Sequence, residues 1–193
     1  MSLPRIFLIG PMGSGKTTVG RFLASRMGIE FRDLDQEIER RCGVEVRTIF
    51  DIEGEQGFRI REHAMLDELS QRNGVLLATG GGSILKPENR EILHSRGLVV
   101  WLKTRVDQQI RRLEKDQRRP LLQAPDREQR LQRLAEQRDP LYQQCAHLIV
   151  RSDNVSPMQM ATRAGQQIQN YLDQNRSNQN SPNNKPVNQE NAS

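Results

Sequence analysis

The residues with the clearest chemical capacity form the run Gly10-Pro11-Met12-Gly13-Ser14-Gly15-Lys16-Thr17, which matches the pattern G-x-x-x-x-G-K-[ST]. An apolar stretch precedes the run and a helical pattern follows it, as a phosphate-binding loop requires. Glycines in such a loop let backbone N–H groups face a phosphate, the lysine adds positive charge, and the threonine hydroxyl binds Mg²⁺. The run therefore predicts binding of a nucleoside triphosphate by Gly13, Ser14, Gly15, Lys16, Thr17 and Thr18.

Two carboxylates, Asp33 and Asp35, follow the second candidate strand where a helical pattern begins. Capping of that helix would account for either residue alone. A pair at the carboxyl end of a strand, in a protein that binds phosphate, also suits one carboxylate near Mg²⁺ and one on an acceptor hydroxyl. We favour this functional interpretation, with which capping remains compatible.

Three consecutive glycines, Gly80, Gly81 and Gly82, follow the third candidate strand. Successive glycines destabilise ordinary structure, so they indicate a backbone that must approach another group closely. The alternative interpretation is a flexible surface turn.

The elements that must position these residues alternate along the chain. Short apolar runs predict strands at 5–9, 75–78, 98–102 and 147–150, and a weaker run predicts one at 30–32. Helical spacing is found at 16–27, 35–41, 55–72, 87–95, 106–114, 127–144 and 157–172. This alternation predicts a parallel α/β sheet with helices on both faces, whose ligands bind at the carboxyl ends of the strands.

Length and composition predict one folded domain with a polar tail. The chain has 193 residues, and after Asp173 it is dominated by Asn, Gln, Ser and Pro. We therefore expect a domain at 1–173 and a disordered segment at 174–193. No apolar run approaches the roughly 20 residues that cross a bilayer, and the first apolar stretch is too short for a signal peptide. With two distant cysteines, Cys42 and Cys145, interpreted as buried thiols, a cytoplasmic protein is expected.

The formal charge of +5 suits either a nucleic-acid binder or an enzyme that handles anions. Basic residues recur between acidic ones, and five phenylalanines, two tyrosines and one tryptophan offer little for base stacking. Small anions are therefore expected as partners, without nucleic acid or membrane. A GTPase is disfavoured because the only Asn-Lys pair, Asn184-Lys185, lies in the tail, and most motors need a longer chain.

Six motifs follow one another as they do in shikimate kinases, and the chain resembles that family over nearly all of residues 5–160. They are the phosphate loop, Asp33-x-Asp35, Phe58-Arg59, Thr79–Gly82, the run 118–122 (RRPLL) and the run 138–142 (RDPLY). The resemblance implies a three-layer α/β P-loop NTPase fold with a five-stranded parallel sheet, like that of nucleoside monophosphate kinases. It also implies a substrate-binding segment at about 33–62 and a mobile lid at about 112–125.

The activity implied by this resemblance is ATP- and Mg²⁺-dependent phosphorylation of the 3-hydroxyl of shikimate, on the chorismate route to aromatic amino acids. Lys16, Asp35 and Arg119 would be catalytic: Asp35 would accept the hydroxyl proton and Arg119 would reach the γ-phosphate from the lid. Thr17 would bind Mg²⁺, and Asp33 would lie beside the ion, outside its direct ligands.

The same resemblance implies binding roles for further residues. Arg59 and Arg138 would clamp the substrate carboxylate, a role that suits the planar guanidinium fork, while Gly80, Gly81 and Gly82 would offer backbone contacts. Arg112 would pack on the adenine. The adenine loop departs from some relatives by having Val155 in place of an arginine, so its contact would come from the backbone.

Two other functions fit parts of the sequence. Another small-molecule kinase of the same fold, such as a gluconate kinase, would share the phosphate loop but not the pairing of Arg59 and Arg138 with three glycines. A nucleotide-gated nucleic-acid-binding protein would use the basic surface and would not require Asp35. A monomer is expected, because no helix shows an unexplained apolar stripe.

Overall fold

The computed structural model describes residues 4–113, 126–152 and 155–179, and its strands and helices alternate as the sequence predicts. The strands are β1 (Ile6–Ile9), β2 (Glu30–Asp33), β3 (Val75–Ala78), β4 (Leu98–Lys103) and β5 (Leu148–Arg151). The helices are α1 (Lys16–Met27), α2 (Leu34–Cys42), α3 (Val46–Leu69), α4 (Pro87–Arg96), α5 (Val106–Leu113), α6 (Arg127–Cys145) and α7 (Pro157–Gln179), with a 3₁₀ turn η1 (Ser83–Leu85).

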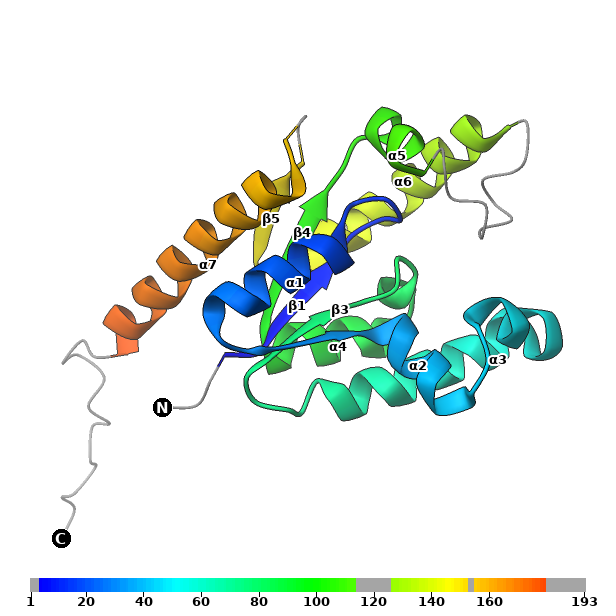
Figure 1. Ribbon diagram of the computed structural model, residues 1–193, viewed down its shortest axis with the longest axis horizontal. Coiled ribbons are helices and arrows are strands. Elements are labelled where there is room, and N and C mark those ends of the chain that lie inside the picture. Colours follow the sequence, from blue (N-terminus) through cyan, green and yellow to red (C-terminus); the bar gives the residue numbers. More distant parts are fainter. Residues whose placement is uncertain (1–3, 114–125, 153–154, 180–193) are drawn as a thin grey trace, which may run out of the picture.

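The five strands form one parallel sheet in the order β2-β3-β1-β4-β5 (Figure 1). Strand β1 lies at its centre, pairing Ile6 with Leu76 of β3 and with Leu98 of β4. The chain continues from β1 to one side of the sheet and later returns to the other side. Ligands of open α/β sheets bind where the strand order reverses in this way, here at the carboxyl end of β1.

Alternating side chains of the strands divide the core into two layers. In β1, Phe7 and Ile9 join one buried cluster while Ile6 and Leu8 join the other. Helices α1 and α7 cover the second layer, and α3, α4 and α6 cover the first (Figure 1). The predicted three-layer α/β fold with a five-stranded parallel sheet is thus confirmed.

Two helices differ in extent from the sequence prediction. Helix α3 consists of two helical segments, because Gly54, at φ 70° and ψ −176°, breaks the helical geometry between them. The predicted helix start at residue 55 agrees with the second segment, whereas the first segment, which begins at Val46, was not predicted. Helix α7 runs on to Gln179, so the predicted domain boundary at 173 falls inside a helix. Once tertiary packing has formed the first turns of a helix, adding further residues to its end requires little free energy, even when those residues are polar. The rest of the expected tail, 180–193, lies outside the described residues.

Both cysteines are free thiols. Cys145 is buried as expected, and burial raises the pKa of its thiol to about 11. The expectation for Cys42 is wrong, because this side chain is only half-buried and its Sγ lies 3.6 Å from Nη1 of Arg61. Within the described part of the chain, no helix has the length and apolar character needed to cross a membrane.

A histidine pair at the amino ends of the strands predicts a loss of stability in acid. The rings of His94 and His147 stack with centroids 4.2 Å apart, and Nδ1 of His147 accepts a 3.0 Å hydrogen bond from the Val99 amide. Burial and the neighbouring His94 lower the pKa of His147. As the pH falls below about 6.5, the unfolded chain therefore binds more protons at this position than the folded protein does, and the free energy of unfolding should fall until the folded-state His147 is itself protonated.

Urea denaturation between pH 5 and pH 8 would measure this effect. The His147→Asn variant retains an acceptor atom for the Val99 amide but has no titrating ring. Its unfolding free energy should vary less over this range than that of the unmodified chain. Equal pH dependence of the two proteins would contradict the assignment to His147.

Candidate active site

The phosphate loop links β1 to α1 and requires glycine at several positions. Gly13 and Gly15 have φ of 72° and 89°, in the left-handed region where side chains are disfavoured. A Cβ atom on Gly10 would lie 2.8 Å from the carbonyl oxygen of Leu102 in β4. The loop is therefore packed against the centre of the sheet and leads into the N-terminus of α1, where an anion is favoured.

Lys16 folds back over this loop. Its ammonium donates hydrogen bonds to the carbonyl oxygens of Gly10 at 2.7 Å and Pro11 at 2.9 Å, and lies 3.4 Å from Oγ of the buried Ser14. The positive charge is thus held where the loop would enclose a phosphate. Thr18, two residues after Lys16 in α1, is exposed.

Thr17 and Asp33 join the phosphate loop to the end of β2. The Thr17 hydroxyl donates a 2.7 Å hydrogen bond to Oδ2 of Asp33. The other oxygen of Asp33 accepts from the amides of Asp35 and Gln36 at 3.2 and 3.4 Å, so Asp33 also caps α2. Hydroxyl and carboxylate oxygens are suitable ligands for Mg²⁺. No group of three or more His, Cys, Asp or Glu side chains suited to a metal ion is found within residues 4–113, 126–152 and 155–179.

Asp35 and Glu62 converge on the glycine loop that follows β3. A Cβ atom on Gly80 would lie 3.0 Å from Oδ1 of Asp35 and 2.8 Å from Oε1 of Glu62. Glycine at this position therefore lets two carboxylates approach the backbone from α2 and α3. The close approach indicated by the glycine run is made here by acidic side chains.

Arg59 is anchored by Glu62 one helical turn away. Its Nη1 lies 2.7 Å from Oε2 of the fully buried Glu62, whose Oε1 accepts a 2.6 Å hydrogen bond from Ser83. Glu55 binds the exposed side of the same guanidinium at 3.1 Å. Burial acts to lower the pKa of Arg59, but Glu62 and Glu55 outweigh it, so the pKa is raised and the charge is fixed.

Glu62 is a residue of this site that the sequence patterns do not reveal. Its only signal is the spacing of three residues from Arg59, which also occurs in exposed ion pairs on helix surfaces. Its complete burial, which distinguishes it from those pairs, becomes visible only in the folded chain.

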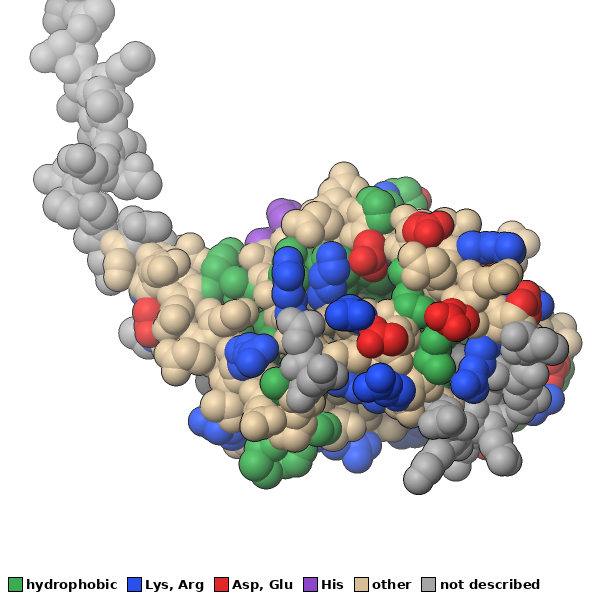
Figure 2. Space-filling view, turned by 90° about the horizontal axis from the view of Figure 1, so that it is seen from above, with side chains coloured by type: hydrophobic (Ala, Val, Ile, Leu, Met, Phe, Trp, Pro, Cys, Tyr) green, Lys and Arg blue, Asp and Glu red, His purple; other side chains and the backbone are tan. Residues whose placement is uncertain are grey.

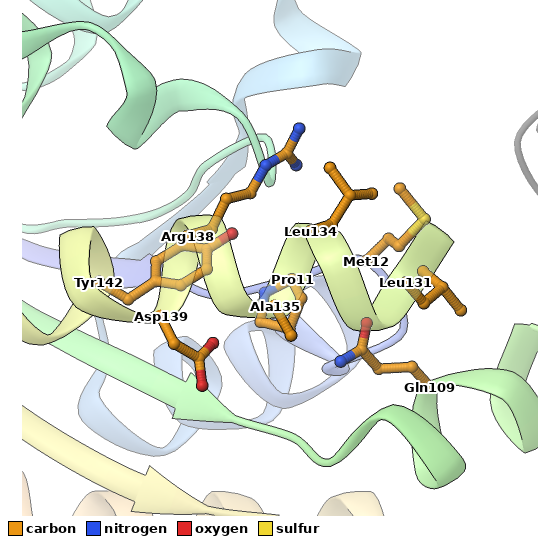
Figure 3. A pocket seen from close by; sticks show the side chains of 9 residues that line it. All are labelled: Pro11, Met12, Gln109, Leu131, Leu134, Ala135, Arg138, Asp139 and Tyr142. Carbon is orange, nitrogen blue, oxygen red and sulfur yellow. The ribbon is translucent and has the colours of Figure 1, made fainter. Parts of the chain in front are cut away.

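Arg138 reaches the glycine loop from α6, far along the chain. Its Nη1 lies 3.4 Å from the carbonyl oxygen of Gly81, which also accepts a 2.6 Å hydrogen bond from the Tyr142 hydroxyl. Figure 3 shows both side chains directed to the same side of α6, with Asp139 directed to the other. They line a small pocket together with Pro11, Met12, Gln109, Leu131, Leu134, Ala135 and Asp139.

The residues expected to bind adenine are more dispersed. Arg112 lies on α5, and its Nη1 donates to the carbonyl oxygen of Gly13 at 3.2 Å, while burial lowers its pKa. Val155 is half-buried and packs against the core layer covered by α1 and α7. Arg119 and the expected lid beyond Leu113 lie outside the described residues.

The phosphate loop lies where the strand order reverses. Asp35, Arg59 and Arg138 gather round the neighbouring glycine loop. Together the two loops can bring a nucleotide phosphate to an anionic acceptor. This combination of fold and site defines a small-molecule kinase of the P-loop class. Known proteins refine the assignment. A family model described as shikimate kinase matches residues 12–169.

Individual relatives agree with the family model. A shikimate kinase of Shewanella pealeana is 49% identical over 163 residues, which cover 84% of this chain and 95% of the relative. One from Halorhodospira halophila is 52% identical over 165 residues, covering 86% and 93%. Among solved structures, shikimate kinase from Acinetobacter baumannii in complex with shikimate matches with a TM-score of 0.84, 48% identity, and coverage of 88% and 94%. This chain belongs to the shikimate kinase family.

The contact between Gly82 and Arg59 predicts the effect of a single added methyl group. A Cβ atom on Gly82 would lie 2.7 Å from Cζ of Arg59, although the backbone at φ −102° and ψ −3° tolerates any residue. Because the clash involves the end of a side chain, Gly82→Ala should displace Arg59 rather than unfold the protein. We expect the KM for an anionic acceptor to rise about tenfold, with the KM for ATP little changed.

Steady-state kinetics with each substrate varied in turn would measure this effect. Gly165→Ala in α7 is a matched control, since the new Cβ would meet only Cδ2 of Leu23, at 3.4 Å. An unchanged acceptor KM in Gly82→Ala would show that Arg59 does not need its present position.

Proposed function

We propose that this chain transfers the γ-phosphoryl group of ATP to the 3-hydroxyl of shikimate, forming shikimate 3-phosphate and ADP. The observation that carries the proposal is the approach of Asp35 and Arg59 to the same glycine loop, at Gly80 and Gly82, beside the phosphate loop. One small acceptor can therefore place its hydroxyl against the Asp35 carboxylate and its own carboxylate against the Arg59 guanidinium. The shikimate bound in the Acinetobacter relative supports this choice of acceptor.

In the proposed reaction, the chain acts mainly by alignment and charge. Arg59 and Arg138 would hold the shikimate carboxylate through paired N–H donors. Asp35 would align the 3-hydroxyl with the γ-phosphorus and receive its proton late, because a carboxylate is a much weaker base than an alkoxide. Lys16 would leave its carbonyl partners for the β- and γ-phosphates, and Arg119 would add charge from the lid.

Magnesium is part of the proposal. The Thr17 hydroxyl would be its protein ligand, and the Asp33 carboxylate, 2.7 Å from that hydroxyl, would lie beside the ion. When bound, Mg²⁺ neutralises part of the negative charge on the phosphates. Gly13, Ser14, Gly15 and Thr18 would contribute loop and helix contacts to the nucleotide, with Arg112 and Val155 beside the adenine.

The proposed enzyme works as a cytoplasmic monomer with small-molecule substrates. Its described surface favours this over nucleic-acid binding, because on the face seen in Figure 2 Lys and Arg side chains alternate with Asp and Glu. The two free thiols suit a reducing compartment. A salt-dependent gel shift with DNA or RNA would instead favour the nucleic-acid-binding alternative.

Release of ADP from Mg-ATP tests the proposal, with shikimate, gluconate or no acceptor added. We expect shikimate alone to stimulate release strongly. Stimulation by gluconate alone would favour the other kinase considered above. No increase in ADP release with either shikimate or gluconate would contradict a kinase that acts on one of these acceptors.

A further inference from the structure

Tyr142 is a buried residue whose hydroxyl reaches the glycine loop that follows β3. Only 1% of its surface is exposed, and its ring stacks on Trp101 of β4 with centroids 5.5 Å apart. The ring thus belongs to the core layer under α6, while its hydroxyl donates a 2.6 Å hydrogen bond to the carbonyl oxygen of Gly81. A phenylalanine would fill the same core space, so packing alone does not account for the hydroxyl.

The hydroxyl shares its acceptor with Arg138. Nη1 of Arg138 lies 3.4 Å from the Gly81 oxygen, at the outer limit of a hydrogen bond, whereas the tyrosine bond is short. Arg138 and Tyr142 are four residues apart on α6 and therefore share one helix face (Figure 3). Because Tyr142 satisfies the carbonyl, the guanidinium is not required to do so.

Gly81 is less closely enclosed than the glycines on either side of it. The atoms nearest to a Cβ on Gly81 would be Met12 N at 3.5 Å, Gly10 O at 3.6 Å and Pro11 C at 3.7 Å, which are ordinary contacts. Its neighbours Gly80 and Gly82 are enclosed more tightly, by Asp35 with Glu62 and by Arg59. Among the described residues, Tyr142 and Arg138 are the side chains that donate to the Gly81 carbonyl.

We propose that Tyr142 is a positioning residue of the acceptor site: its hydroxyl fixes the Gly81 carbonyl and thereby keeps Arg138 available for the acceptor carboxylate. This inference rests on the proposed function, in which Arg138 is part of the carboxylate clamp. Without the hydroxyl, the half-buried Gly81 carbonyl would compete with the substrate for the Arg138 guanidinium. Burial raises the pKa of the Tyr142 phenol, so the donor stays protonated throughout the neutral range.

The test is Tyr142→Phe in the full-length chain, with Tyr171→Phe as the matched control, since the chain has two tyrosines. Tyr171 lies on α7, where its ring contacts His147 at the opposite end of the sheet. We expect Tyr142→Phe to raise the KM for shikimate about tenfold while the KM for ATP stays within about twofold. Tyr171→Phe should change neither constant.

A second comparison separates positioning from simple loss of packing. If Tyr142 acts through Arg138, Tyr142→Phe should change the shikimate KM by less than about twofold when introduced into Arg138→Ala. A further tenfold rise in that background, or an equal rise in both KM values for the single variant, would overturn the inference. Absence of shikimate-dependent turnover in the unmodified chain would overturn the proposed function as well, and is seen before any variant is made.

Discussion

Replacing Asp35 by asparagine should leave ATP binding intact and lower kcat for shikimate by roughly 10²- to 10⁴-fold. Asp35 lies in the first turn of α2, and its carboxylate oxygen approaches Gly80. Asparagine has nearly the same shape but cannot accept the hydroxyl proton. The helix cap is supplied by Asp33 and the phosphate loop is separate, so the fold and the nucleotide site should be preserved.

Single-turnover kinetics with equilibrium binding of ATP would measure the two effects separately. Asp173→Asn, which changes the same chemical group on α7, is the matched control and should behave as the unmodified chain. Turnover of Asp35→Asn within about threefold of normal would remove Asp35 from the role of proton acceptor.

Replacing Arg59 by alanine should damage both acceptor binding and stability. The acceptor would lose a bidentate partner, and we expect its KM to rise about 100-fold with little change in the KM for ATP. Glu62 would remain fully buried without its cation, and breaking a buried ion pair in this way costs about 3 kcal/mol or more. The midpoint of urea unfolding should therefore fall as well.

A second substitution separates these two effects. In Arg59→Ala/Glu62→Gln the unpaired buried charge is absent, so much of the lost stability should return while the acceptor KM stays high. Urea denaturation and steady-state kinetics on the same preparations would measure both. Recovery of acceptor affinity together with stability would contradict a direct role of Arg59 in the carboxylate clamp.

The parts of the site that sequence predicts are those formed by neighbours in the chain. The phosphate loop follows from the spacing of its glycines, Lys16 and Thr17, because a continuous run folds around one phosphate group. Apolar runs likewise predict β1, β3, β4 and β5, since strands covered on both faces are largely apolar. The edge strand β2 gave only a weak signal, because its sequence is Glu-Phe-Arg-Asp and none of its residues is fully buried. The pair Asp33 and Asp35 was open to two interpretations, and the structure shows that Asp33 caps α2 and also binds Thr17.

The contacts that sequence does not predict join residues distant along the chain. Tyr142 is 61 residues from Gly81, and no periodicity links a tyrosine on one helix to a glycine after a strand. The requirement for glycine at 82 arises from the Arg59 side chain and not from the backbone conformation, so the glycine run alone does not reveal its cause. The extension of α7 to Gln179 was likewise hidden, because its polar composition matches that of a solvated tail.

The stacking of Trp101 on Tyr142 places the indole, an intrinsic fluorophore, next to a residue that contacts the Gly81 loop. The chain contains a single tryptophan, so its emission comes from one indole at one known place. That indole is fully buried, with Lys103 4.7 Å from its ring centroid and Tyr142 on α6 stacked against it. Movement of α6 or of the Gly81 loop changes the surroundings of this one fluorophore. We therefore expect acceptor binding beside Gly81 to alter the emission of Trp101, so that occupancy can be followed without a label and without turnover.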